Sequence, residues 1–187
     1  MKITFLAGLS LLVCLAVSSP APALVSSAVN FKDVERGTEV ELYGIRAGFY
    51  MYVNERYDYS VWVPASMAQK VVLIADNDDG IIMESSDGLA RFRASGGLAE
   101  FVEGGLKGSF DRAVKDAGPG LIDKAFASGP NGHWVVNWRD GDVIHHRKFV
   151  IKGDNWFDCE LSYPASQAAR YERSVEGVMS EIDPINK

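Results

Sequence analysis

The sequence is poor in cysteine, since its 187 residues include two, Cys14 and Cys159. Small exported domains often depend on a framework of several disulfide bonds, and two cysteines exclude such a framework. Cys159 lies in the segment WFDCELSY, where strand alternation puts it on one face with Phe157, Leu161 and Tyr163. We interpret it as a small buried hydrophobic residue rather than a reactive thiol, because no electropositive setting for a thiolate is evident.

Common catalytic and nucleotide-binding motifs are also absent. The sequence contains no G-x-S-x-G nucleophile motif, no H-E-x-x-H zinc motif and no glycine-rich phosphate-binding loop. It has no basic run, and its formal net charge is -6. The phosphates of a nucleic acid would repel such a chain. We therefore expect no cofactor and no nucleic-acid partner, and a protein that binds rather than catalyses.

Long apolar runs are missing as well. The most apolar stretch, Ile3 to Val17, is shorter than the roughly 20 apolar residues that a membrane span needs. Lys2 precedes this stretch, and Ala21-Pro22-Ala23 fits the A-x-A cleavage pattern of secretory signal peptides. We therefore predict that residues 1–23 are a cleaved signal peptide. The mature protein is then exported, periplasmic or secreted, and keeps no membrane anchor.

What remains after residue 23 has the length of one domain, and a hydrophobic fraction of 47% supports a globular fold. Residues 24–40 show no clear period, and we interpret them as a lead-in segment or one short strand before a single domain over 41–187. Alternating β-branched and aromatic residues predict strands at 48–53, 59–64, 70–75, 81–84, 89–94, 121–127, 133–138, 142–151 and 156–163.

Helical spacing of apolar residues occurs in two stretches, 97–117 and 166–182. The order is therefore strands, helix, strands, helix. Asp-Gly turns between neighbouring strands favour hairpins and hence antiparallel pairing. Together these features predict an α+β fold, with a mostly antiparallel sheet of about six to seven strands and two main helices packed on it.

Three segments resemble the pattern of the PsbP-like fold group, as found in small exported bacterial proteins of unassigned function. They are NERYDYSVWVP (54–64), NDDGIIMESSDGLARFRA (77–94) and CELSYP (159–164), the last just before the final predicted helix. The resemblance implies a group that contains binders and assembly factors more than enzymes, and it supplies no catalytic residues. It favours an exported, non-enzymatic binding or accessory module that acts on a protein partner in the cell envelope.

Turn positions bring a set of polar and aromatic side chains onto one face of the predicted sheet. Arg147 would lie opposite Trp134 on one neighbouring strand and opposite Glu160 on the other. His145 shares this face, because side chains two residues apart point to the same side of a strand. The arrangement assumes two-residue hairpin loops at Asp140-Gly141 and Gly153-Asp154.

These four residues allow three interpretations. An Arg147–Glu160 pair across two strands is an ordinary feature of a half-exposed sheet, and it would suit a surface that meets a protein partner. Trp134 and Arg147 could instead bind a small planar or anionic ligand by stacking and by charge. His145 and Glu160 could also serve a small hydrolase, which would require a deep pocket and a histidine of perturbed pKa.

An acidic turn, residues 76–80, is the stronger candidate for a metal site, since a pair of His133 and His146 would lack further ligands. It does not fit the EF-hand loop, because Ala75 and Ser86 would occupy the first and twelfth ligand positions. Acidic turns are also common at hairpin tips. We therefore predict no metal site, with a looser cation site as the alternative. That alternative would use Asp76, Asp78 and Asp79.

Overall fold

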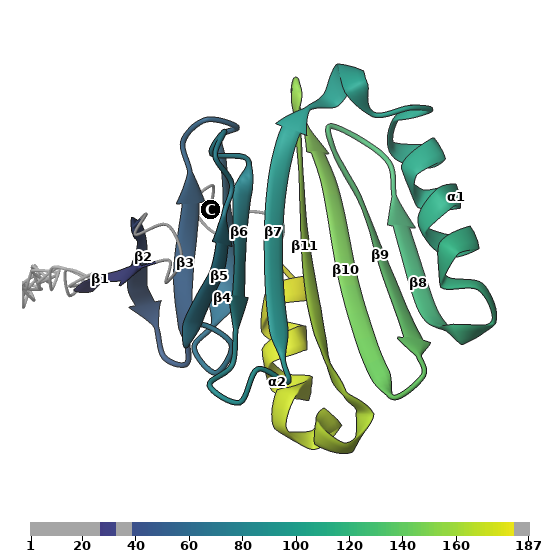
Figure 1. Ribbon diagram of the computed structural model, residues 1–187. Coiled ribbons are helices and arrows are strands. Elements are labelled where there is room, and N and C mark those ends of the chain that lie inside the picture. The colour runs from purple at the N-terminus through teal and green to yellow at the C-terminus, as the bar shows by residue number, and fades with distance from the viewer. Residues whose placement is uncertain (1–26, 33–38, 182–187) are drawn as a thin grey trace, which may run out of the picture.

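The computed structural model describes residues 27–32 and 39–181, whose strands form two antiparallel sheets (Figure 1). The first sheet has the order β1-β2-β3-β4, with β1 (Ser27–Lys32), β2 (Glu39–Arg46), β3 (Phe49–Asn54) and β4 (Tyr59–Pro64). The second has the order β5-β6-β7-β11-β10-β9-β8. Its strands are β5 (Lys70–Ile74), β6 (Gly80–Glu84), β7 (Arg91–Leu98), β8 (Leu121–Ala127), β9 (Asn131–Asp140), β10 (Val143–Lys152) and β11 (Asn155–Pro164).

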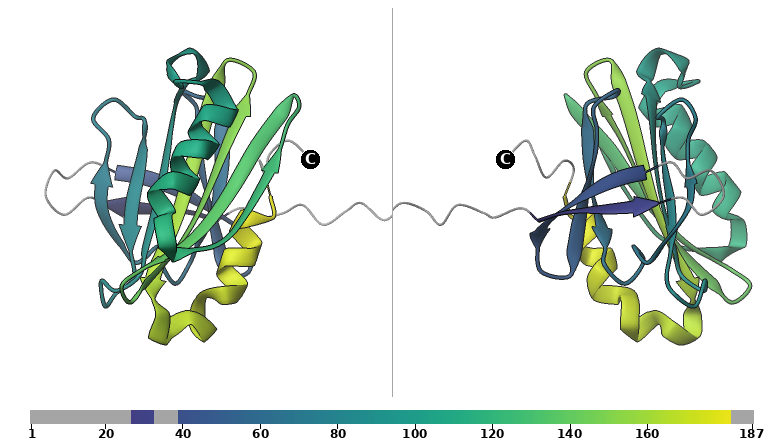
Figure 2. Two further views of the ribbon diagram at one scale, coloured as in Figure 1. Left: turned by 90° about the vertical axis from the view of Figure 1, so that its right-hand side faces the viewer. Right: turned by 60° about the vertical axis from the view of Figure 1, so that its left-hand side comes forward.

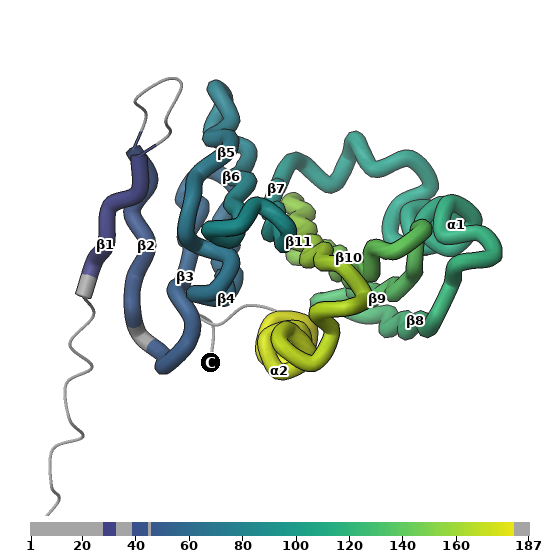
Figure 3. Tube along the Cα trace, turned by 60° about the horizontal axis from the view of Figure 1, so that its bottom comes forward, coloured from purple at the N-terminus to yellow at the C-terminus, as the bar shows by residue number. Residues whose placement is uncertain are grey.

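Two main helices lie on opposite sides of the second sheet (Figure 3). Helix α1 (Gly105–Ala117) packs against β9 and β8 on the outer side (Figure 2). Helix α2 (Ala168–Met179) packs on the inner side, against β10 and β11 and against β4 of the first sheet. The predicted α+β class is confirmed, and the second sheet alone has seven strands. The separate four-stranded sheet was not predicted.

The helix predicted for 97–117 begins later than its apolar spacing indicated. Strand β7 extends to Leu98, a turn of 3-10 helix follows at Ala99–Phe101, and α1 begins at Gly105. Backbone φ at Gly104 is +67°, in the left-handed region that favours glycine. The chain changes direction there, so the first part of the predicted helix is wrong. Apolar residues continue with helical spacing on both sides of the break, so the spacing alone does not reveal where the helix begins.

The N-terminal region contributes strands to the first sheet. Residues 27–32 of the predicted lead-in segment form β1, and β2 begins at Glu39 and continues across the boundary that we placed after residue 40. The predicted signal peptide, residues 1–23, lies outside the described residues. In the part of the chain that the structure describes, no helix has the length and apolar character needed to cross a membrane.

The main core lies between the two sheets and α2. Tyr59 of β4 stacks on Phe157 of β11, with ring centroids 5.2 Å apart and planes 8° apart. Cys159 is fully buried there, which confirms its interpretation as a core residue, and burial raises the pKa of its thiol to about 11. A smaller core on the outer side of the second sheet includes Trp134 and Phe149, beneath α1.

Candidate functional site

The outer face of β7, β11 and β10 carries polar side chains, although the inner face of β7 and β11 is apolar. On β11, Phe157, Cys159 and Leu161 belong to the main core, while Asp158 and Glu160 alternate with them and point outward. Helix α1 packs over β9 and β8 on this outer side. The charged side chains therefore lie next to the helix rather than under it.

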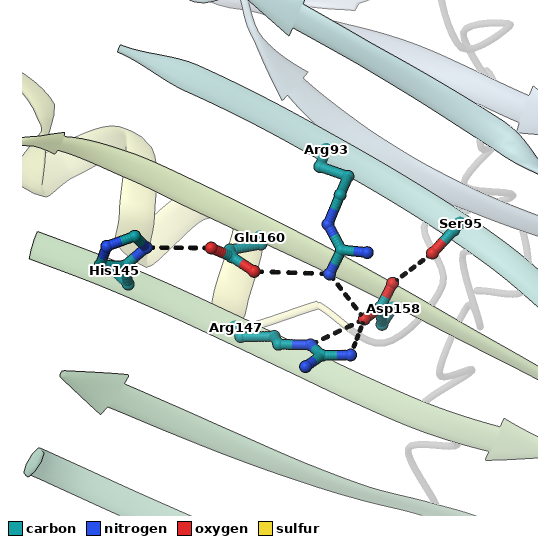
Figure 4. A network of polar contacts seen from close by, with 6 residues as sticks. All are labelled: Arg93, Ser95, His145, Arg147, Asp158 and Glu160. Carbon is teal, nitrogen blue, oxygen red and sulfur yellow. Dashed lines mark hydrogen bonds and ion pairs between the residues drawn. The ribbon is translucent and has the colours of Figure 1, made fainter. Parts of the chain in front are cut away.

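Asp158 is the centre of the polar network on this face (Figure 4). Its side chain is 1% exposed, yet it bears a carboxylate that accepts from three donors. Arg147 Nε donates to it at 2.7 Å, Arg93 Nη2 at 3.0 Å and Ser95 Oγ at 2.6 Å. A buried carboxylate is costly unless it is paired, and these donors supply the pairing. The bonds to Asp158 in turn hold both guanidinium groups in place.

Glu160 is the second carboxylate of the network. It lies 3.0 Å from His145 Nδ1 and 3.4 Å from Arg93 Nη2. Burial alone would raise the pKa of Glu160, but the hydrogen bond with His145 and the charges of Arg93 and Arg147 outweigh it and lower the pKa. The ring of Trp138 stacks on His145 with centroids 4.6 Å apart. Glu160 is thus held as an anion by its hydrogen bond with His145 and by the nearby guanidinium groups.

The register between β10 and β11 agrees with the sequence analysis. Arg147 pairs with Glu160 and His145 with Ser162, as a two-residue loop at Gly153-Asp154 requires. The predicted residues His145, Arg147 and Glu160 are therefore brought onto one face of the sheet. The structure adds that Asp158, rather than Glu160, is the direct partner of Arg147.

The register between β9 and β10 differs from the prediction. The chain turns at Gly141-Asp142 rather than Asp140-Gly141, with Gly141 at φ +57° in the first loop position. Trp134 therefore pairs with Phe149, and its predicted pairing with Arg147 is wrong. A shift of two residues keeps every side chain on its face. The Arg147 guanidinium still lies 5.6 Å from the centroid of the Trp134 ring.

Sequence reasoning missed three members of the network, Arg93, Ser95 and Asp158. Asp158 could have been found, because it precedes Glu160 by two residues on the same predicted strand. Arg93 and Ser95 lie on β7, which pairs with β11 although many residues separate these strands in the chain. No hairpin loop joins the two strands, so the register rules for hairpins could not place β7 beside β11.

A hollow of about 330 Å³ opens beside the network, between α1 and the sheet. The residues around it are Phe101, Val102, Ser109, Arg112, Ala113, Asp116, Trp134, Arg147, Phe149 and Trp156. Two residues of the predicted site, Trp134 and Arg147, thus line it. His145 and Glu160 line neither this hollow nor the depressions near Glu39 and near Gly153.

The acidic turn joins β5 to β6 and lies against the first sheet. Asn54 Nδ2 donates to the Asp78 carbonyl at 2.6 Å, and Tyr59 Oη donates to the Asp79 carbonyl at 3.2 Å. Within residues 27–32 and 39–181, no group of three or more His, Cys, Asp and Glu side chains could hold a metal ion. The alternative of a cation site at Asp76, Asp78 and Asp79 is therefore not supported.

Comparisons with known proteins do not extend what the geometry shows. No family model matches the chain, and no curated protein matches its sequence. The solution structure of cyanobacterial PsbP (CyanoP) from Synechocystis sp. PCC 6803 is similar, with a TM-score of 0.38 and 13% sequence identity. The match covers 88% of this chain and 96% of that chain. At this TM-score the likeness carries no argument about function.

Proposed function

We propose that this chain is an exported, non-enzymatic binding module that engages a protein partner in the cell envelope. The proposed contact surface is the charged face, defined as Arg93, His145, Arg147, Asp158 and Glu160 on β7, β10 and β11. The observation that carries the proposal is that its charged groups bind one another across a half-exposed part of the sheet, and that Arg147 alone among the five borders the hollow.

Two arginines of the charged face are available to a partner in fixed positions. The side chains of Arg93 and Arg147 are each 33% exposed, whereas the carboxylate of Asp158 that holds them is buried. Arginine and tryptophan are enriched among the residues that dominate binding energy, and Trp138 lies beside this face. Side chains that are already ordered lose less entropy on binding. These features support a protein partner.

The alternative of a hydrolase that uses His145 and Glu160 has less support. Glu160 is bound to His145 and Arg93, and its lowered pKa suits an ion pair rather than a general acid. The hollow beside α1 is lined by neither His145 nor Glu160. A substrate held in that hollow would therefore not meet the proposed catalytic pair.

Export is supported by the signal-peptide pattern of residues 1–23. The test of the whole proposal is recovery of the tagged protein, after cross-linking, from the envelope fraction of its own organism. We expect a mature N-terminus at Leu24 and at least one protein partner. Arg93→Gln should reduce the yield of this partner, because it removes one guanidinium while Arg147 continues to hold Asp158.

Arg139→Gln is the matched control, because Arg139 is an exposed arginine on β9 that pairs with Asp142 outside the charged face. It should recover the partner as the wild type does. Recovery of no protein above background by the wild type would overturn the binding module. Equal recovery by wild type and Arg93→Gln would show that the partner binds elsewhere on the molecule.

A further inference from the structure

We propose that the hollow between α1 and the second sheet binds a small planar aromatic anion, of the aryl carboxylate class. We call it the aromatic hollow, formed chiefly by Phe101, Arg112, Trp134, Arg147, Phe149 and Trp156. The proposal extends the sequence-based interpretation of Trp134 and Arg147, and it goes beyond the protein partner proposed above. Its residues, apart from Arg147, do not belong to the charged face.

Three aromatic rings from neighbouring strands line the aromatic hollow. The rings of Trp134 and Phe149 have centroids 5.4 Å apart and planes 11° apart, and those of Phe149 and Trp156 are 5.5 Å and 18° apart. Trp134 is 1% exposed and Phe149 is 5% exposed, so these two rings form the closed floor of the hollow, while the half-buried Trp156 is open to a ligand. Trp134 Nε1 donates to Ser109 Oγ of α1 at 2.9 Å, which ties this floor to the helix. A planar aromatic ligand would pack against Trp156 and Phe101 above this floor, in the stacked or edge-to-face arrangements that aromatic pairs favour.

Two guanidinium groups supply the charge that an anion needs. Arg147 binds Asp158 through Nε and Nη2, so Nη1 is the nitrogen left to meet a ligand. Arg112 on α1 is 47% exposed, and its contact with the fully solvated Glu103 is long, at 3.8 Å. One carboxylate, Asp116, also lines the hollow, so the two guanidinium groups leave a net positive charge there. Guanidinium groups recognise carboxylates with paired hydrogen bonds.

The size and walls of the hollow fit a molecule with one or two rings. A volume of about 330 Å³ lies at the lower end of the range for ligand sites. A Cβ on Gly97 would lie 2.9 Å from Trp156 Nε1, so glycine there lets the indole ring occupy its place in the wall. Phe101 at the mouth is 77% exposed. A ligand that packs against Phe101 would remove this apolar surface from water.

The experiment is titration calorimetry with 1-naphthoate, and with 1-naphthalenemethanol as a neutral probe of similar shape. We expect saturable 1:1 binding of 1-naphthoate, and binding of the alcohol that is weaker by about tenfold or more, because the charge-assisted hydrogen bonds are lost. Arg112→Gln should weaken 1-naphthoate binding by a similar factor. Ala113→Phe should abolish it, because the added ring fills the hollow from α1 without removing a polar group.

Arg139→Gln and Arg93→Gln are the controls, and both should bind 1-naphthoate like the wild type. The failure of this proposal is thereby distinguished from the failure of the protein-partner proposal, which Arg93→Gln tests. A melting temperature close to that of the wild type would show that each variant is folded. Absence of 1-naphthoate binding, equal affinity for the neutral alcohol, or unchanged binding by both Arg112→Gln and Ala113→Phe would each overturn the proposal.

Discussion

His146 faces the inner side of the second sheet, and its surroundings should make the protein less stable in mild acid. Nδ1 lies 3.0 Å from Asn137 Oδ1, and Nε2 lies 2.8 Å from Tyr163 Oη. Burial, and to a lesser extent the charge of His145, lower the pKa of His146 from 6.5 to about 4. An unfolded chain would bind a proton at His146 in this interval and the folded chain would not. The free energy of unfolding is therefore highest above pH 6.5, where His146 is neutral in both states, and it decreases as the pH falls toward 4.

We expect this residue to lower the free energy of unfolding by on the order of 2 kcal/mol between about pH 7 and pH 4.5. Urea unfolding of wild type and His146→Gln at the two pH values measures the effect, and the variant should lose less stability on acidification. His133→Gln is the control, since His133 contacts a neighbouring backbone carbonyl at the surface. Equal losses in wild type and His146→Gln would show that the pH dependence has another origin.

Helix α2 depends on a buried lysine at its C-terminal end. Lys148 of β10 is 2% exposed, and its Nζ donates to the Val178 carbonyl at 2.7 Å. The last carbonyls of a helix have no intrahelical donors and carry the negative end of the helix dipole. The buried ammonium therefore compensates the helix end, and the helix end in turn helps to compensate the buried charge.

Lys148→Met should weaken the attachment of α2 to the sheet. Because the Val178 carbonyl loses a charged donor, we expect a loss of about 2 kcal/mol in stability and faster amide exchange in residues 168–179. Lys107→Met is the control, because Lys107 is 64% exposed and pairs with Asp111 on the surface of α1. Hydrogen exchange followed by mass spectrometry resolves the two helices. Unchanged exchange in α2 of Lys148→Met would contradict the proposed role of the lysine.

Strands and hairpins were largely predictable because their determinants are local. Alternation of apolar residues and Asp-Gly turns lie within a few residues of each other, and the strand predicted at 121–127 has the observed bounds. The turn at Asp140-Gly141-Asp142 was harder, because either overlapping pair of residues suits a two-residue loop. The structure selects the second pair, which moves the register by two residues.

The candidate site was half predictable for a similar reason. Hairpin geometry links β9, β10 and β11, so His145, Arg147 and Glu160 could be placed together from the sequence. The pairing of β7 with β11 depends on contacts between distant parts of the chain, and it brings in Arg93. The hollow could not be predicted, because it depends on where α1 begins after the break at Gly104.

The two sheets share one hydrophobic core, and this should make the protein unfold as a unit. Buried residues from β3 and β4, from β6, β7 and β11, and from α2 belong to the same cluster. Tyr59 is 2% exposed and joins the sheets through its stack on Phe157. Neither sheet can separate from the other without exposing this apolar surface to water, which opposes partial unfolding.

We therefore expect one cooperative transition in urea, with the most protected amides of both sheets exchanging at the same free energy. Tyr59→Ala should lower that free energy in both sheets equally, by about 3–5 kcal/mol, because a large buried ring is lost from the shared core. Phe126→Ala is the control, since Phe126 is 40% exposed on the edge strand β8 and should cost much less. A shared core requires that the loss of stability appears in both sheets. If Tyr59→Ala made the amides of the first sheet exchange faster and left those of the second sheet unchanged, the two sheets would be separate folding units.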